Sequence, residues 1–339
     1  MKSRLVRVLR CPACRGELKL HAGGHDPSDG HVMSGTLRCD RCGTSYAIAG
    51  GVPRLLAGAA SALEQERRWT ASRFGYLWSQ STAAPTAAPA PYHFEKIQAA
   101  VGLPPASGRV LDAGCGEGVD LENVGRRPGV EVVGVELSDG GAAASFARTR
   151  RLDDVHVVQG DLRMLPLADE TFDLVYAYGV VHHLTPPDAA MGELARVARP
   201  GAVVAIYVYE DFATRALPLR VGLGVVNSVR GVTTRLSPRV LFALCRVASP
   251  LVFAACTVPH RLLRNVPGLR AIAAGLPFRH GTHAFGLTGD LFDRFSAPIE
   301  LRFSREGTAA LLRGAGLEDV RLGYERGWVG AASKPAQRS

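Results

Sequence analysis

The feature that most constrains the fold is a glycine-rich turn directly after a short apolar run, "GRVLDAGCGEG" at 108–118. Val110 to Ala113 predict a buried strand. The three glycines that follow predict a turn where the backbone approaches a ligand closely. A dinucleotide fingerprint would place its third glycine one position later, where Val119 stands, so NAD is the weaker interpretation.

Three further apolar runs end in polar groups. "VEVVGVELS" closes on Glu136, "VHVVQGDLRMLP" carries Asp161, and "FDLVYAYGVVHHL" ends near Tyr178. The alternation of such runs with helical stretches from about 107 to 210 predicts a parallel sheet wrapped by helices. Ligands bind outside the carboxyl ends of such strands, and an acidic group there can accept hydrogen bonds from ribose hydroxyls. We therefore expect a small-molecule site at this edge.

Two CxxC pairs stand at the front of the chain, separated by 24 residues that leave room for a hairpin. Four thiolates predict a closed, structural zinc site, and redox dithiols or unbound thiols are the alternatives. We expect His21, His25 and His31, in the intervening loop, to be solvated. The predicted metal ligands are Cys11, Cys14, Cys39 and Cys42.

Composition shifts divide the chain. We expect a zinc-ribbon domain at 1–57, a connecting segment at 58–106 with an Ala/Pro-rich stretch at 81–91, and an α/β domain at 107–333. A basic, apolar, mostly helical insertion at about 211–303 interrupts the α/β domain. Ser304 predicts the cap of a closing helix, and two short strands follow it.

The net charge of +9 is concentrated in this insertion. From Phe212 to Gly289 there are ten arginines and no acidic residue. Few aromatic residues accompany them, which weakens a base-stacking interpretation. A basic, apolar segment also suits an anionic membrane surface.

We expect a cytoplasmic protein, with peripheral association with a membrane as the alternative. Arg7 and Arg10 interrupt the N-terminus before a signal sequence can form. The longest apolar runs, such as "VASPLVFAACTV" at 247–258, carry a proline and stay well under the roughly 18 residues that a membrane span needs.

Five motifs, in order, resemble the class I S-adenosylmethionine-dependent methyltransferases of the type 11-like branch. They are "LDAGCGEG" at 111–118, "GVELS" at 134–138, "GDLRMLP" at 160–166, "FDLVYAYGVVHHL" at 172–184 and "RVARPGA" at 196–202, where Ala202 replaces the usual glycine. The resemblance implies a Rossmann-like, seven-stranded α/β sheet, a helical insertion within it, and S-adenosylmethionine as the cofactor.

The same resemblance assigns roles to individual residues. It places Asp112, Gly114 and Gly116 around the methionine part of the cofactor, Glu136 at the ribose, Asp161 and Leu162 at the adenine, and Tyr178 beside the methyl group. Asp161 has an alternative role as an ion-pair partner of Arg163. His182 and His183 suit a general base or an acceptor-orienting group, since a histidine pKa lies near neutrality. Packing beside the cofactor loop is the alternative for both.

The paired cysteines lie within a second resemblance. "CPACRGEL" and "LRCDRCGTSYAIAGGVPRLL" resemble the small zinc-ribbon activator subunit of tRNA, rRNA and release-factor methyltransferases. This resemblance covers about 5–57 and implies a ribbon fused ahead of a methyltransferase. "RFGYLW" at 73–78 either covers the cofactor pocket or packs the two parts together.

Three functions remain open. The favoured one is O-methylation of a sugar, glycan or other small-molecule acceptor, with the insertion as a lid. The second is an RNA methyltransferase that grips RNA through the ribbon and the arginines. The third is a non-catalytic partner-binding module. Further candidates for a base or an acceptor contact are Glu210, Asp211, Asp290 and Asp293.

Overall fold

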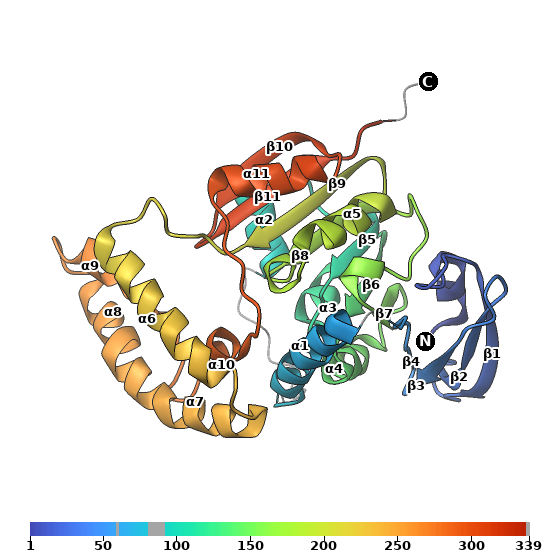
Figure 1. Cartoon of the computed structure of the whole chain (residues 1–339), viewed down its shortest axis with the longest axis horizontal. Coiled ribbons are helices and arrows are strands. Elements are labelled where there is room, and N and C mark those ends of the chain that lie inside the picture. Colours follow the sequence, from blue (N-terminus) through green and yellow to red (C-terminus); the bar gives the residue numbers. More distant parts are fainter. Residues whose placement is uncertain (59–60, 81–91, 337–339) are drawn as a thin grey trace. The chain divides into compact units, whose positions relative to one another are not determined.

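A computed structural model describes residues 1–58, 61–80 and 92–336. The Ala/Pro-rich stretch at 81–91 lies outside the described residues. The chain forms two compact units (Figure 1). Unit 1 comprises residues 1–214 and 299–339, and unit 2 comprises residues 215–298.

The front of unit 1 is a small antiparallel sheet of four strands in the order β1-β2-β3-β4. A 3₁₀-helix, η1 (Ser3–Val8), precedes β1 (Leu18–His25), β2 (Val32–Cys39), β3 (Ser45–Ala49) and β4 (Val52–Pro53). The β1–β2 hairpin pairs Leu18 with Cys39 and so returns the second cysteine pair to the first. Leu5, Leu37 and Ile48 are buried beneath it. The predicted ribbon is confirmed.

The rest of unit 1 is a seven-stranded sheet in the order β10-β11-β9-β8-β5-β6-β7. Its strands are β5 (Gly108–Ala113), β6 (Val130–Glu136), β7 (Val155–Gln159), β8 (Phe172–Tyr178), β9 (Ala198–Val208), β10 (Glu318–Tyr324) and β11 (Trp328–Ser333). β11 is antiparallel to both of its neighbours, and the pairs between β5, β6, β7, β8 and β9 are parallel. This topology confirms the expected fold class, because buried runs of Val, Leu and Ala suit a sheet covered on both faces.

Helices connect and cover these strands. They are α2 (His93–Val101), α3 (Val119–Gly125), α4 (Asp139–Thr149), α5 (Pro187–Val197) and α11 (Arg305–Gly314), with short 3₁₀ turns η2 (Leu162–Met164) and η3 (Val181–His183). Ser304 caps α11 by accepting a hydrogen bond from the Gly307 amide, as expected. The helix α1 (Ser61–Gln80) follows the ribbon and packs against α4.

Unit 2 is helical. It contains α6 (Leu217–Thr233), α7 (Pro238–Val252), the π-helical turn η4 (Phe253–Thr257), α8 (Val258–Leu263), α9 (Arg270–Gly275) and α10 (Thr288–Ser296). α10 packs against α7 and α6 (Figure 1), and its Leu291 and Phe292 are buried there. The helical character of the insertion is confirmed.

One structural feature of unit 2 departs from the sequence expectation. α7, η4 and α8 form a continuous helical segment, Pro238–Leu263, of 26 residues. Within the described part of the chain it is the one helix that is long and apolar enough to cross a membrane, by length and composition alone. The prolines did not end the helix, because Pro259 lies in the first turn of α8, two residues after the π-helical turn, and Pro250 is accommodated inside α7. The expectation that the apolar runs stay well under the length of a membrane span was therefore wrong.

Candidate functional site

The glycine turn after β5 has a backbone that requires glycine. Gly114 and Gly116 have φ angles of 89° and 53°. A Cβ on Gly114 would lie 2.3 Å from a methyl carbon of Val180, and one on Gly116 would lie 3.1 Å from the Trp78 ring. Both positions therefore need glycine, for their positive φ angles and for the close approach of Val180 and Trp78.

Asp112 is the penultimate residue of β5, two positions before Gly114, and is almost completely buried. Burial, and then the negative charge of Asp120, raise the pKa of its carboxyl well above the ordinary value. By its geometry Oδ2 has no hydrogen-bond partner among the described residues, although the nearby Tyr176 hydroxyl acts to lower the pKa of this carboxyl. A buried carboxylate oxygen without a donor is costly, so the position fits a cationic or hydrogen-bonding ligand group.

Glu136 ends the neighbouring strand β6. Its carboxylate accepts hydrogen bonds from the Gly116 amide at 3.2 Å, the Ser138 amide at 2.9 Å and the Ser138 hydroxyl at 2.6 Å. Burial raises the pKa of Glu136, and these hydrogen bonds act in the opposite direction. The structure thus brings Glu136 to the same turn as Asp112, as the sequence predicted for neighbouring strand ends.

Asp161 follows β7 and is buried in a cluster of arginines. It accepts hydrogen bonds from the Arg163 side chain at 3.0 and 3.1 Å and from Arg67 at 3.0 Å, and it caps η2, which begins with Leu162. Burial raises its pKa, but the hydrogen bonds and charge of Arg163 outweigh burial and hold the pKa below the ordinary value. The ion pair with Arg163 was one of the two sequence interpretations, and the adenine contact stays a prediction.

Arg67 is a residue that sequence reasoning missed. It lies in α1, 94 positions before Asp161, and is buried. A single arginine on a helix carries no signal of a partner so distant in sequence. A Glu64 three positions earlier, which also pairs with Arg67, gives only a local hint.

Aromatic side chains gather where β8 and β9 end. The Tyr178 ring stacks between His93 and Tyr207, with centroid distances of 4.2 and 4.3 Å. Its hydroxyl donates a hydrogen bond to Glu325 at 3.1 Å. These contacts fix the orientation of Tyr178 at the strand end.

Both predicted histidines are buried in the turn η3 beside this cluster. The His182 ring lies 4.0 Å from Tyr209, and Nδ1 of His183 lies 2.6 Å from the Ile299 carbonyl oxygen. A carbonyl oxygen can only accept, so Nδ1 of His183 carries the proton and the neutral ring has its acceptor at Nε2. That tautomer is the one a general base needs.

The other acidic candidates separate into two places. Glu210 is buried and accepts a hydrogen bond from the Tyr324 hydroxyl at 2.8 Å, and Asp211 accepts one from the Ala213 amide at 3.0 Å. Asp290, in unit 2, pairs with His280, and Asp293 lies three residues later on α10. Glu210 thus follows β9 in unit 1, whereas Asp290 and Asp293 belong to the other unit.

Helix α1 lies over the carboxyl edge of the sheet. Its Trp78 ring faces Gly116, its Gly75 packs against Ser138 and Gly140, and its Phe74 ring lies 5.3 Å from His183. A cavity of about 440 Å³ lies between α1 and the ends of β6 and β7. Its lining includes Arg67, Ala71, Gly75, Tyr76, Leu137, Asp139, Gly140 and Gln159. The "RFGYLW" segment therefore lies at the predicted cofactor edge.

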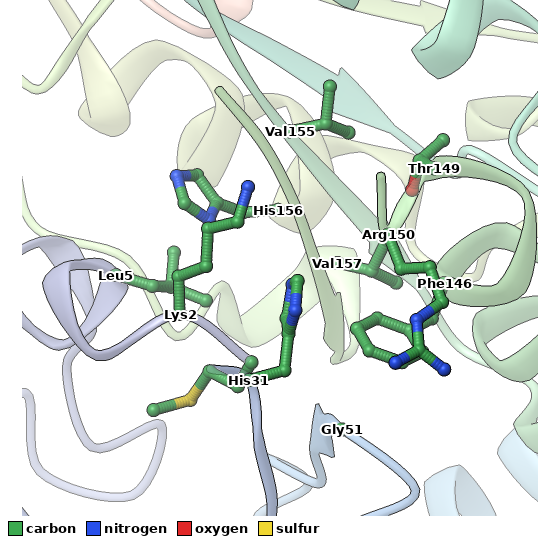
Figure 2. A pocket seen from close by; sticks show the side chains of 11 residues that line it. Lys2, Leu5, His31, Gly51, Phe146, Thr149, Arg150, Val155, His156 and Val157 are labelled. Carbon is green, nitrogen blue, oxygen red and sulfur yellow. The ribbon is translucent and has the colours of Figure 1, made fainter. Parts of the chain in front are cut away.

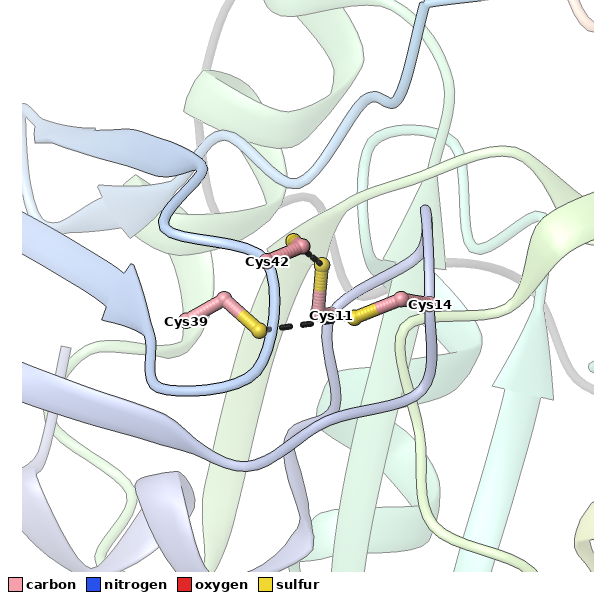
Figure 3. A group of neighbouring side chains, drawn as sticks. All are labelled: Cys11, Cys14, Cys39 and Cys42. Atoms are coloured by element: carbon pink, nitrogen blue, oxygen red, sulfur yellow. Dashed lines mark hydrogen bonds between the residues drawn. The ribbon is translucent and has the colours of Figure 1, made fainter.

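The four cysteines of the ribbon converge on one point (Figure 3). All four Sγ atoms lie within 4.8 Å of one another, with Cys11 and Cys42 at 3.7 Å and Cys14 and Cys39 at 3.5 Å. A Cβ on Gly16 would lie 2.9 Å from Sγ of Cys39, so the loop needs glycine there. Four converging thiolates match a tetrahedral zinc shell without an open position.

The ribbon packs tightly on α4 and β7. Figure 2 shows Lys2, Leu5, His31 and Gly51 of the ribbon facing side chains such as Phe146 around a cavity of about 10 Å³. Only a single water fits such a space. His31 is buried there and contacts the Phe146 ring at 5.3 Å, so the expectation that it is solvated was wrong. We call this interface between the ribbon and the elements α4 and β7 the seam. It buries His31, and it forms only when the chain folds back on itself.

Hydrogen bonds and ion pairs hold the same seam. Arg150 pairs with Asp26 and Asp29 of the ribbon, each at 2.6 Å. After β4, the amide of Leu55 donates to the Gln159 carbonyl at 2.9 Å, and Arg54 forms a parallel bridge with Gln159. The ribbon therefore continues the sheet edge at β7, two residues before Asp161.

Two family comparisons agree with this architecture. Residues 111–206 match the family described as a methyltransferase domain, and residues 2–51 match the family described as Trm112p-like protein. The chain contains a methyltransferase domain preceded by a Trm112p-like domain. The first match covers all five sequence motifs in full, from "LDAGCGEG" at 111–118 to "RVARPGA" at 196–202.

Two curated relatives match this chain over less than half of its length. A sterol 24-C-methyltransferase of Schizosaccharomyces pombe is 34% identical over 143 residues, which is 38% of this chain and 38% of that protein. A malonyl-[acyl-carrier protein] O-methyltransferase of Pectobacterium atrosepticum is 36% identical over 110 residues, covering 32% of this chain and 42% of that protein. The chain thus spans less than half the length of these relatives.

Among solved structures, a complex between the Haloferax volcanii Trm112 methyltransferase activator and a putative methyltransferase is 14% identical. It covers 82% of this chain and 100% of that chain, with a TM-score of 0.43. The YcgJ protein of Bacillus subtilis is 25% identical over 40% of this chain and 57% of that chain, with a TM-score of 0.32.

Proposed function

We propose that this protein is an S-adenosylmethionine-dependent methyltransferase whose acceptor is a small-molecule or glycan hydroxyl. The observation that carries the proposal is the buried Asp112 carboxylate, whose Oδ2 has no hydrogen-bond partner among the described residues and which lies below a turn that only glycine can form. Glu136 meets the same turn from the neighbouring strand. These residues fit a ligand that carries an ammonium group and ribose hydroxyls.

When bound, the cofactor supplies an already activated methyl group on a sulfonium. The chain itself then has three tasks: binding, orientation and exclusion of water. Asp112 would hold the amino group, Glu136 the ribose hydroxyls, and the segment of Asp161 and Leu162 the adenine. Tyr178 would form the wall beside the methyl group, and Trp78 on α1 would keep water from the turn.

A hydroxyl acceptor must lose its proton as the new bond to carbon forms. His183 suits this role, because the Ile299 carbonyl holds the proton on Nδ1 and leaves Nε2 as the acceptor. His182 and Tyr209, packed beside it, would orient the acceptor. This arrangement supports an O-methylation in which His183 takes the hydroxyl proton.

The ribbon has a structural role in this proposal. Its four cysteines would hold one zinc ion with a closed shell, so the metal would stabilise the fold and take no part in methyl transfer. The reduced cysteines that such a site needs support a cytoplasmic location.

An RNA acceptor is the second candidate, and the match to the Trm112p-like family favours it. Retention of bulk RNA on the purified protein, measured over a salt series, distinguishes the two. An RNA enzyme retains RNA at low salt and loses it steeply as salt rises. An absence of retention at low salt removes this candidate.

Calorimetric titration with S-adenosylmethionine tests the cofactor assignment. Asp112→Asn and Glu136→Gln keep the side-chain shapes but remove the charges, so each should weaken binding by about tenfold or more. Asp290→Asn, on the exposed surface of unit 2, is the matched control and should leave the affinity unchanged. Undiminished affinity in both site variants, with normal thermal melting, would contradict the assignment.

A further inference from the structure

Unit 2 displays a long row of apolar side chains to solvent. On the helical segment Pro238–Leu263, exposed apolar residues recur at intervals of three, four or seven positions, and the spacing of those within α7 places them on one helix face. They are Val240, Leu244, Val247, Leu251, Val258 and Leu262, with exposed fractions between 37% and 73%. We call this row the apolar stripe. Leu241, Cys245 and Ser249 are buried on another face, which packs within unit 2.

A second helix of unit 2 repeats the pattern. On α6, exposed apolar residues recur every three or four positions, at Leu217, Val221, Val225, Val229 and Val232. Arg230 is the buried residue of this helix, and it donates a hydrogen bond to the Ala297 carbonyl at 2.8 Å. Soluble monomers rarely expose so many large apolar side chains together, so such faces mark interaction sites.

Charge limits what can cover these faces. Unit 2 contains eleven arginines, two aspartates, and neither lysine nor glutamate. Its formal net charge of +9 therefore equals that of the whole chain, and unit 1 is formally neutral. A second copy of unit 2 would bring an equal positive charge to the interface and be repelled, whereas an anionic partner would be attracted.

The arginines are placed beside the stripe. Arg239, Arg246 and Arg261 are exposed, and each directly precedes a stripe residue, so each lies about 100° around the helix axis from it. Arg246 also lies over the Phe285 ring, with 5.6 Å between the guanidinium carbon and the ring centroid. An apolar row flanked by arginines is the pattern of a helix that lies in a membrane interface.

The same arginines argue against a membrane span. Arg246 lies between four and five residues from the middle of the segment, which is about 7 Å along the axis. A spanning helix would hold its charge inside the hydrocarbon core, where a charged side chain is costly. A helix parallel to the surface keeps the charge among lipid headgroups.

RNA fits the faces less well than lipid does. Exposed valines and leucines gain nothing from a phosphate backbone, and among the large apolar side chains of unit 2 Phe285 is the exposed aromatic one. Binding of single-stranded nucleic acid normally uses several stacking rings.

We infer that unit 2 docks on the surface of an anionic phospholipid bilayer. The apolar stripe enters the boundary between headgroups and acyl chains, and the flanking arginines contact lipid phosphates. This inference rests on exposure and charge in unit 2 and does not require the proposed methyltransferase activity.

Co-sedimentation of the full-length protein with vesicles tests it. One vesicle type is phosphatidylcholine alone, and the other contains equal parts of phosphatidylcholine and phosphatidylglycerol. Most of the protein should pellet with the anionic vesicles and stay in solution with the neutral ones. Added salt should lower the pelleted fraction, since screening weakens the arginine contacts.

Two triple variants separate the two contributions. Leu244→Ser with Val247→Ser and Leu251→Ser removes stripe residues, and Arg239→Gln with Arg246→Gln and Arg261→Gln removes the flanking charges. Each should lower partitioning by about tenfold or more. The matched control, Arg68→Gln with Arg126→Gln and Arg199→Gln, removes three exposed charges from unit 1 and should bind as the parent does.

Several outcomes overturn the inference. Equal recovery in both supernatants excludes bilayer docking, and equal pelleting with both vesicle types excludes its anionic specificity. Loss of binding in the unit 1 control would assign the effect to net charge alone. If the parent protein forms a concentration-dependent dimer and the stripe variant does not, the apolar stripe is an interface with a second copy of the chain and not a lipid-binding face. All the changed side chains are exposed, so unchanged thermal melting of each variant ensures that binding is what is compared.

Discussion

The ribbon and unit 2 are both additions to the same α/β sheet, but the apolar side chains of the two parts differ in their exposure to solvent. Leu5, Leu37 and Leu55 of the ribbon are buried in one core cluster with Leu111 and Val133 of the seven-stranded sheet. In unit 2, whole rows of valine and leucine face solvent. Among the described residues of unit 1, the exposed large apolar side chains are Trp69 and Tyr324.

Their charges differ in the same way. Ribbon aspartates pair with Arg150 of α4, and ribbon Arg54 pairs with Asp139. Unit 2 carries the net charge of the entire chain. The ribbon thus has its partner inside the chain, whereas the apolar and charged surface of unit 2 is suited to a partner outside it.

Among the changes that test this difference between the ribbon and unit 2, loss of zinc from the ribbon should have the largest effect on stability. Cys39→Ser should lower bound zinc from about one ion per chain to nearly none and destabilise unit 1 by more than about 4 kcal/mol, because a small ribbon depends on its metal. Metal analysis and thermal melting measure both effects. Cys256→Ser in unit 2 is the control and should retain zinc. A zinc-free ribbon that melts normally would mean that docking alone maintains its fold.

A matched pair of leucines tests the contrast directly. Leu37 in the ribbon is fully buried, and Leu251 in unit 2 is 71% exposed. Leu37→Ala should cost about 2–5 kcal/mol of unfolding free energy, and Leu251→Ala should stay within about 0.5 kcal/mol. Urea denaturation measures both. Equal costs would show that Leu251 is buried in solution by a partner such as a second copy.

Acidification should produce a smaller effect, at the ribbon seam. Burial lowers the pKa of both His31 and His156, although Asp29 and Glu131 act in the opposite direction. The unfolded chain therefore binds protons more readily than the folded one. This contribution to stability is complete above the ordinary histidine pKa of 6.5 and is lost as pH falls below it toward the folded values.

Urea midpoints measured about one pH unit above and one below 6.5 check this prediction. The midpoint should be lower on the acidic side, and His156→Gln should reduce the difference. His21→Gln, at an exposed ribbon position, should leave it unchanged. A urea midpoint that rises on acidification would contradict the prediction that buried His31 and His156 lose stability when they are protonated.

Much of the fold was predictable because its signals are local. The run "VLDAGCGEG" predicted a strand and a glycine turn, and β5 with its positive φ angles at Gly114 and Gly116 follows it. Asp112 and Glu136 were predicted to meet because the carboxyl ends of neighbouring parallel strands share one edge. The spacing of the cysteines likewise predicted the hairpin that brings them together.

Contacts between distant segments were not predictable in this way. Arg67 reaches Asp161 because α1 crosses the sheet edge, and His31 is buried because the ribbon packs on α4. Prolines suggested that the apolar segment of unit 2 breaks, but the π-helical turn lets the helix continue. Each of these outcomes depends on packing or on backbone compensation that one segment does not encode alone.

The sequence by itself determined which residues form the strands, the glycine turn, the cysteine hooks and the basic insertion, because periodicity, φ requirements and ligand spacing act within short segments. Only the tertiary structure decided that Asp161 is held by arginines from two elements, that the ribbon extends the β7 edge, and that the valines and leucines of unit 2 stay exposed. Burial and pairing are properties of surfaces that meet, and those surfaces exist only after the chain has folded.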